Sequence, residues 1–293
     1  MMRKAMNRMR GIGAVCAASF DAWIHAPRVA VMGLCVVAYC LLQAKGNARS
    51  LQVNGIPVTL TLTEMLFIKL NNGFYEMASL LFLVMVSELP RRIAYQEDML
   101  LRSSKIRWLL GQAAYCVLTV LSMMLCLSAL YLLFSWLGGA RGLGNAFSET
   151  ALIEAEQYSQ WESLIPLYIR QSTTPWGACL MAAGPMFFFW LSMVLLFLLL
   201  GLLGRQMLGP MIYGFLLFFN VAVLVEMFPG GIQTPVSFST LAAISSRAMG
   251  SDTELQLLRE ALLGYVTACA ALMLALMLTV KRADLSFREE NRE

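Results

Sequence analysis

Glu76 lies in a long apolar stretch that ends at Pro90, and it is the side chain in this sequence best placed for membrane chemistry. A helix needs about 20 mostly apolar residues to cross a bilayer, so a crossing that ends at Pro90 must contain Glu76. On a helix of 3.6 residues per turn, four polar residues fall within about 80° of one another: Asn72, Glu76, Ser79 and Ser87. A polar face with a carboxylate avoids lipid and marks a candidate functional site. The alternative is that Glu76 extends to the outer surface and has no role.

A second group of polar residues lies in the apolar stretch between 207 and 228. Tyr213 and Asn220 are seven residues apart and share one face of a helix. Glu226 lies about 240° around from Asn220, so only a bend would bring all three into one cavity. The polar residues of both groups are candidates for a functional site inside the membrane: Asn72, Glu76, Ser79, Tyr213, Asn220 and Glu226.

Catalytic chemistry has little support in the sequence. The one histidine, His25, lies beside Trp23, and the zinc motif HExxH, the nucleophile motif GxSxG and the CxxC pair are all missing. The phosphate loop GxxxxGK[ST] is missing too. We therefore predict no catalytic residue, no metal ligand and no bound cofactor in this chain, which would not be an enzyme. Any ATP and Mg²⁺ would be bound by another chain.

The elements that position these residues must be membrane helices. The chain is 59% hydrophobic and only 14% charged, with a mean hydropathy of +0.67, whereas soluble proteins are about 25% charged. Charges are missing between Arg107 and Arg141 and between Arg170 and Arg205. Continuous apolar runs of this length predict an all-α polytopic membrane protein and not a β-barrel, whose strands alternate.

We predict six transmembrane helices in a membrane domain of residues 26–280, followed by a tail of residues 281–293. The predicted spans are 26–43, 70–89, 109–136, 177–203, 207–228 and 261–280. Residues 1–25 are predicted to form an amphipathic helix on an anionic membrane surface. Its apolar residues recur at spacings of three and four: Met2, Met6, Met9, Ile12, Cys16, Phe20 and Trp23.

The distribution of Lys and Arg sets the predicted orientation. With the N-terminus inside, 15 of the 22 Lys and Arg residues lie in cytoplasmic segments, as the positive-inside rule requires. We therefore predict that both termini are cytoplasmic and that the protein is integral to the cell membrane, a prokaryotic plasma membrane.

Three connections are predicted on the outer side. Residues 44–69 alternate around an Asn-Gly turn, which predicts a small extracellular hairpin. The long connection 137–176 is acidic in its middle, and residues 229–260 contain an apolar piece that is too short to span but could enter the membrane and return.

The inner connection after the second span is unusually charged. Residues 87–112 read SELPRRIAYQEDMLLRSSKIRWLLGQ, with five basic and three acidic residues. A short helix is expected between Pro90 and Trp108. The alternative is a solvated loop whose basic residues only fix the topology.

This stretch resembles the permease subunits of ABC type-2 transporters. In that family a proline-ended second span leads to a short charged helix and then to a basic, Trp and Gly-Gln entry into the third span. The tight connection GLLGRQMLGPMIYG also suits the family. The resemblance covers nearly the whole chain, but it is mainly architectural, and only residues 87–112 approach a motif. The outer hairpin and the acidic loop depart from compact members of the family.

The resemblance implies a coupling helix that docks on a separate cytoplasmic ABC ATPase subunit. The implied contact consists of Tyr95, Gln96, Glu97, Asp98, Leu100 and Arg102, with Arg205 in a smaller second contact. The family lines its translocation path with spans two and five at a two-fold interface. The resemblance therefore implies that the six polar residues named above line such a path. It also implies a second permease copy or a different permease subunit as partner, besides membrane lipid. No nucleic-acid partner is expected. The implied function is an ATP-driven permease, an exporter that itself supplies the path and no chemistry.

Three other classes of protein remain open. A secondary transporter would use several ionisable groups in the membrane and often an inverted repeat, of which only Glu76 is found. A membrane scaffold, immunity or sensor subunit would present the same surfaces without transport. A membrane enzyme is disfavoured because it would need acid and base residues. Glu76 and the acidic loop would suit a cationic cargo such as a peptide; lipids, glycans and drugs are the other candidates.

Overall fold

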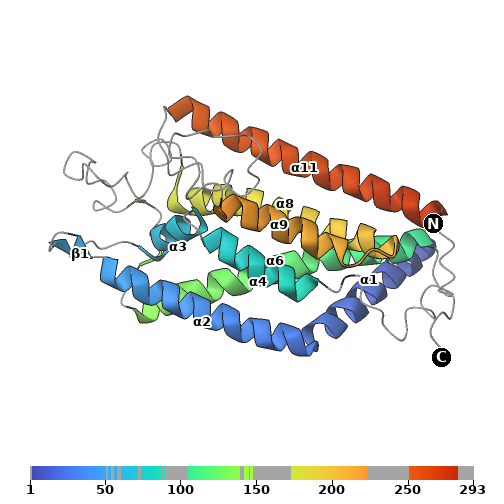
Figure 1. Cartoon of the computed structure of the whole chain (residues 1–293), viewed down its shortest axis with the longest axis horizontal. Coiled ribbons are helices and arrows are strands. Elements are labelled where there is room, and N and C mark those ends of the chain that lie inside the picture. Colours follow the sequence, from blue (N-terminus) through green and yellow to red (C-terminus); the bar gives the residue numbers. More distant parts are fainter. Residues whose placement is uncertain are drawn as a thin grey trace.

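The chain forms a bundle of long helices in the computed structural model (Figure 1). The structure describes the backbone of residues 2–50, 52–53, 56–57, 61–71, 74–87, 89, 105–138, 142–144, 146–147, 173–222 and 251–282. Side chains are described for most of these residues.

Most of the helices run along the length of the bundle and reverse direction from one to the next, except the first two, which run the same way with a bend between them (Figure 1). In chain order they are α1 (Met2–Ile24), α2 (Pro27–Ser50), α3 (Leu62–Asn71), α4 (Phe74–Val86), α6 (Lys105–Leu137), α8 (Pro175–Leu202), α9 (Leu208–Ala222) and α11 (Ser251–Arg282). Three described helices contain segments long and apolar enough to cross a membrane, Lys105–Leu137, Pro175–Leu202 and Leu262–Lys281, and α1 with α2 passes the same test as a pair bent by 66°. The prediction of an all-helical membrane protein is therefore confirmed at this coarse level.

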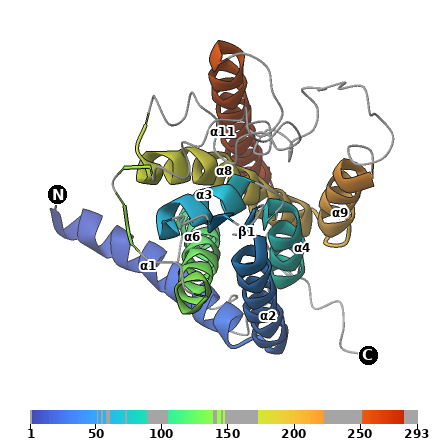
Figure 2. The same ribbon diagram turned by 90° about the vertical axis from the view of Figure 1, so that its left-hand side faces the viewer.

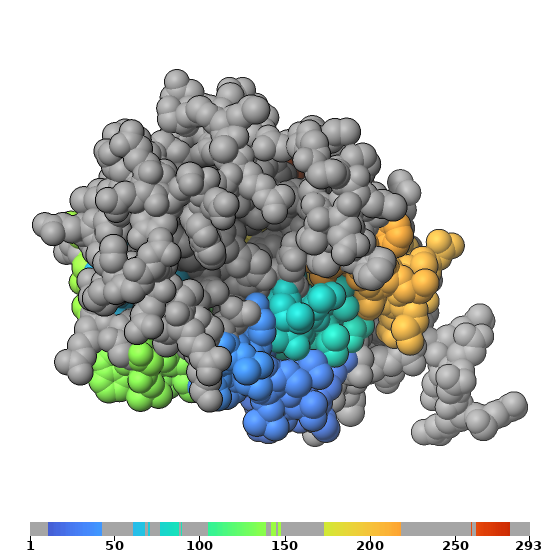
Figure 3. All heavy atoms as spheres, turned by 60° about the vertical axis from the view of Figure 1, so that its left-hand side comes forward, coloured from blue at the N-terminus to red at the C-terminus, as the bar shows by residue number. Residues whose placement is uncertain are grey.

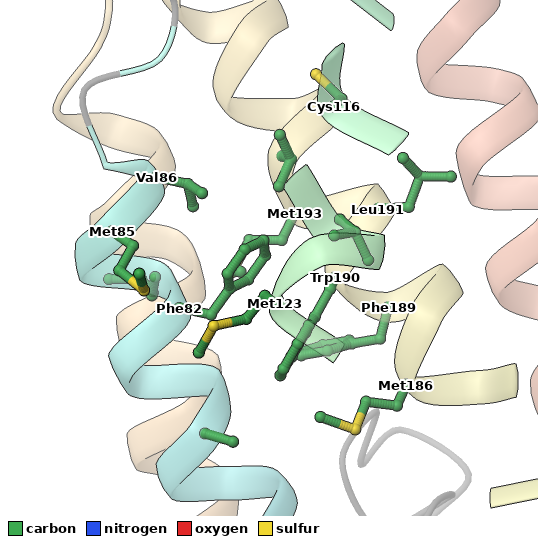
Figure 4. Close-up of a cluster of buried hydrophobic side chains, with 14 of the residues drawn as sticks. Phe82, Met85, Val86, Cys116, Met123, Met186, Phe189, Trp190, Leu191 and Met193 are labelled. Carbon is green, nitrogen blue, oxygen red and sulfur yellow. The ribbon is translucent and has the colours of Figure 1, made fainter. Parts of the chain in front are cut away.

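Helix α8 is the centre of the bundle. It packs against α11, α3, α6, α9 and α4, and its side chains Met186, Trp190 and Met193 are almost fully buried. Figure 4 shows Trp190 and Met193 facing Phe82 of α4, with Met123 of α6 beside them. The rings of Phe82 and Trp190 are stacked, with their centroids 4.6 Å apart. Each neighbouring helix is thus positioned by its contact with α8.

The second predicted span differs from the structure. A single helix was expected over 70–89, but α3 begins at Leu62 and α4 covers only Phe74–Val86. Thr61 and Glu64 form a capping box: the backbone N and Oγ1 of Thr61 donate to Glu64 Oε2 at 2.7 and 2.9 Å, and Glu64 N donates to Thr61 Oγ1 at 3.3 Å. This pairing fixes the start of α3 eight residues before the expected position.

Helix α1 forms where it was predicted, but its buried face is a protein contact. Val15, Ser19 and Trp23 are four residues apart and at most 6% exposed, and α1 packs mainly on α6. Gln112 of α6 donates from Nε2 to Ser19 Oγ at 3.0 Å, and Trp23 Nε1 donates to the carbonyl of Met85 at 3.2 Å. The position of α1 on a membrane surface stays a prediction, and its buried face joins the end of α4 to the start of α6.

The end of the bundle far from the start of α1 carries the short elements (Figures 1 and 2). Strand β1 (Gln52–Val53) pairs antiparallel with β2 (Ile56–Pro57) at the position of the expected hairpin. Trp136 at the end of α6 and Trp176 at the start of α8 are 57% and 41% exposed, as is usual for aromatic residues at a membrane surface. We call this the α3 end. Most of the 137–176 connection and all of residues 229–250 lie outside the described residues.

The contact between α1 and α6 depends on Gly111, and a substitution there tests it. A Cβ on Gly111 would lie 2.6 Å from the Cβ of Val15, so we expect Gly111→Ala to force the two helices apart and lower the free energy of unfolding by about 1–3 kcal/mol. The measurement is thermal unfolding of the purified chain in mild detergent. Gly33→Ala is the control, because a Cβ at Gly33 of α2 meets nothing within 4 Å. Equal melting temperatures for the two variants would contradict the close contact.

Candidate functional site

The predicted path residue Ser79 lies on α4 against the middle of α8. It is fully buried, and Trp190 Nε1 donates a hydrogen bond to its Oγ at 2.7 Å. An indole N–H buried in an apolar bundle is costly unless it has an acceptor. Ser79 therefore supplies that acceptor and fixes the rotation of α4 relative to α8. The Ser79 side chain therefore faces α8 in the interior of the bundle.

Tyr213 of α9 is held by α8 in the same way. Its hydroxyl lies 2.9 Å from Ser192 Oγ, and Ser192 donates its own hydrogen to the carbonyl of Phe189 at 2.7 Å. Because a serine has one hydroxyl hydrogen, Tyr213 must be the donor to Ser192. The Tyr213 ring also makes edge contacts with Phe189 and Phe197, and a Cβ at Gly209 would lie 2.6 Å from Phe197 Cδ1. Helix α9 is therefore seated closely on α8.

The remaining path residues are placed less completely. Glu76 lies on α4 one turn before Ser79, and Asn220 lies on α9 seven residues after Tyr213, but the side chains of both are outside the described part. Asn72 and Glu226 lie outside the described residues altogether. The structure thus brings α4 and α9 together through α8, and the role of these six residues in a path stays a prediction.

The predicted ATPase contact lies in the sequence between two described helices, α4 and α6. Its residues Tyr95, Gln96, Glu97, Asp98, Leu100 and Arg102 all lie outside the described residues. Before this segment, α4 ends near Met85, whose carbonyl accepts a hydrogen bond from Trp23 Nε1, and after it comes α6, in which Gly111 lies against Val15 of α1.

Arg205 occupies the tight turn between α8 and α9. It is exposed, and its backbone N donates to the carbonyl of Leu200 at 2.8 Å. Gly204 before it has a φ of +74°, a conformation that ends helices and that glycine adopts without strain. Its neighbours Leu203 and Met207 are 53% and 80% exposed. This turn presents one cation and two apolar side chains at the end of the bundle that holds α1.

Comparison with family models, curated proteins and solved structures found no match.

Several of the residues that hold this region together were not identified from the sequence. Trp190 and Ser192 lie in the apolar run FFFWLSM. The indole N–H and the hydroxyl were the only hint of their role, because polar groups inside a membrane require hydrogen-bond partners. Gln112 was expected only at the start of the third span, and its hydrogen bond to Ser19 was not predicted. Within the described ranges, no three His, Cys, Asp or Glu residues come together as a group that could hold a metal ion.

The hydrogen bond between Tyr213 and Ser192 predicts an unequal pair of mutational effects. Ser192→Ala leaves the buried Tyr213 hydroxyl without its acceptor and should cost about 1–2 kcal/mol of unfolding free energy, whereas Tyr213→Phe removes the donor itself and should cost about 0.5–1 kcal/mol. The double variant should resemble Tyr213→Phe, because no hydroxyl is then left unpaired. Unfolding in detergent for the four proteins measures this. Strict additivity of the two single changes would show that the bond contributes nothing.

Proposed function

We propose that this chain is the membrane-spanning permease subunit of an ATP-driven ABC transporter, an exporter that works with a separate cytoplasmic ATPase. The proposal includes six spans, cytoplasmic termini and a location in the prokaryotic plasma membrane. The observation that carries it is the resemblance of residues 87–112 to the family's coupling segment, taken with the described helix ends on either side of that segment.

The described helix ends that flank the two proposed ATPase contacts lie toward one end of the bundle (Figure 1). The 88–104 segment connects the end of α4 to the start of α6, and the turn with Arg205 connects α8 to α9 at the same end (Figure 1). On the proposed orientation this end is cytoplasmic, and a single partner could contact both segments. The exposed Leu203 and Met207 would provide apolar contact beside the charge of Arg205.

The helices proposed to line the path lie side by side. α4 contacts α9 and α2, and Figure 3 shows α2, α4 and α9 next to one another on one face of the molecule. Large apolar side chains are exposed on all three helices, among them Leu34, Met77, Val84, Met211 and Phe215. In the proposed transporter a second permease subunit covers this face, and Glu76 and Asn220 are the candidates for contact with the cargo.

The described hydrogen bonds suggest how motion would pass through the chain. A pull on the 88–104 segment acts directly on the end of α4 and the start of α6. Because α4 and α9 are both tied to α8, through Ser79 with Trp190 and Tyr213 with Ser192, they would shift together with α8. The proposed path helices would then move as a unit, which suits a rocking motion between inward and outward openings.

The proposed ATPase contact is tested by purification of the tagged chain from its native host in mild detergent, followed by mass spectrometry and an ATP hydrolysis assay. We expect a soluble ATPase with a phosphate loop to co-purify. The double variant Glu97→Arg/Leu100→Asp should release it, because the charge is reversed and an apolar anchor is lost.

A matched control makes the same chemical changes on the connection proposed to lie outside. Glu154→Arg/Leu152→Asp should retain the ATPase at the level of the unchanged chain. If no ATPase co-purifies with the folded chain, the permease proposal fails. The result would then favour a scaffold or a secondary transporter. If both double variants release the ATPase equally, the 88–104 segment is not the specific contact.

A further inference from the structure

Three helix ends carry cations at the end of the bundle that holds α1. They are Arg107 at the start of α6, Arg205 in the turn after α8 and Lys281 at the end of α11. Helix α6 runs along the bundle in the opposite direction to α8 and α11, so its start lies at the same end as their last residues (Figure 1). The side chains of Arg205 and Lys281 are exposed, and that of Arg107 is half-buried. Positive charge is thus present on three separate elements at one end of the bundle.

Helices α6 and α8 each pair one of these cations with an exposed tryptophan at the α3 end. On α6, Arg107 and Trp136 are 29 positions apart. On α8 and the turn after it, Trp176 and Arg205 are also 29 positions apart. At 1.5 Å per residue this spacing is about 40 Å, and a bilayer with its headgroup regions is about 40–45 Å thick. The two helices therefore place the tryptophans in one headgroup layer and the cations in the other.

Large exposed apolar side chains lie within three positions of each cation along the chain. The apolar residues are Ile106, Met207 and Leu278, with exposed fractions of 49%, 80% and 48%. A phospholipid offers a matching pattern, because its phosphate is anionic and its acyl chains are apolar. The combination of positive charge and apolar surface at headgroup depth therefore favours a lipid over a purely acidic partner.

The positive charge at this end exceeds the negative charge among the described side chains. The ion pair described there joins Asp21 and His25, whose carboxylate oxygen and ring nitrogen are 3.4 Å apart. Glu64 is buried at the α3 end. Lys and Arg residues in excess at a membrane surface attract anionic lipids, with a gain in binding of about five-fold for each residue. An anionic headgroup would therefore supply the negative charge that the described side chains lack.

We propose that Arg107 and Lys281 bind the phosphates of anionic phospholipids in the leaflet around the end of the bundle that holds α1. The two residues lie on helices that contact each other, α6 and α11. Arg205 marks the same depth and stays assigned to the proposed ATPase contact. The lipid site consists of side chains outside α1, so it is separate from the prediction that α1 lies on an anionic surface. It depends neither on transport nor on an ATPase.

The chain contains a matched control cation. Arg259 of α11 is exposed and lies 22 positions before Lys281, which is about 33 Å along the same helix. It therefore lies toward the α3 end, on the other side of the membrane from the proposed lipid site. Arg259→Gln removes the same charge as Arg107→Gln or Lys281→Gln. A change in net charge alone would therefore affect lipid binding by all three variants alike.

The test is native mass spectrometry of the purified full chain in mild detergent, with equimolar phosphatidylglycerol and phosphatidylcholine that carry the same acyl chains. The first headgroup has a net negative charge, and the second has none. We expect the unchanged chain to retain about five-fold more phosphatidylglycerol than phosphatidylcholine. Arg107→Gln and Lys281→Gln should each lower this ratio, and the double variant should bring it close to one. Arg259→Gln should leave the ratio unchanged.

Two further measurements separate lipid binding from anion binding and from misfolding. Glycerol phosphate, which has no acyl chains, should not displace phosphatidylglycerol, because the apolar side chains contribute to binding. Arg107→Lys/Lys281→Arg keeps both charges and should keep the ratio of the unchanged chain. The proposal is overturned if the unchanged chain retains both lipids equally, if Arg259→Gln lowers the ratio as much as Lys281→Gln, or if glycerol phosphate displaces the lipid. None of these measurements needs an ATPase, so failure of the lipid site and failure of the transport proposal are distinguishable.

Discussion

The apolar surroundings of a membrane helix limit what can hold one helix against another. Lipid tails are as apolar as leucine, so helix association depends on close packing and on a few hydrogen bonds. In this chain many of those contacts involve α8. Trp190 and Ser192, two residues apart, bind α4 and α9 respectively, while Phe189 contacts Tyr265 of α11. Removal of α8 would leave these helices with little to define their rotation or depth.

The same constraint explains where glycine is placed. Gly209 lets the start of α9 approach Phe197 of α8, and Gly111 lets α6 approach Val15 of α1. Each glycine lies beside a buried hydrogen bond, Gly209 near Tyr213 and Gly111 next to Gln112. Close backbone approach brings the polar groups within bonding distance, and the hydrogen bond then sets the register. Close packing and hydrogen bonding therefore hold the helices together at the same positions of the bundle.

The helical membrane class could be predicted from the sequence because it depends only on the lengths of apolar runs. The bounds of α6 and α8 followed from the same runs and from flanking charges and Trp residues. The start of α3 was missed although Thr61 and Glu64 carry a recognisable cap, because the alternating residues before it favoured a hairpin. The partners of Ser79 and Tyr213 could not be predicted, since their pairing depends on which helices become neighbours. An amphipathic pattern, such as that of α1, likewise does not say whether its apolar face meets lipid or protein.

The two ends of the bundle are held together differently. At the end that holds α1, a side-chain hydrogen bond from Trp23 and the tight contact at Gly111 tie α1 to α4 and α6. At the other end, the short helix α3 is capped by Thr61, bonded to the Gly142 and Gly144 carbonyls, and buried against α8, α6 and α4. The first end therefore depends on specific contacts between long helices, whereas the second depends mainly on the burial of a short one.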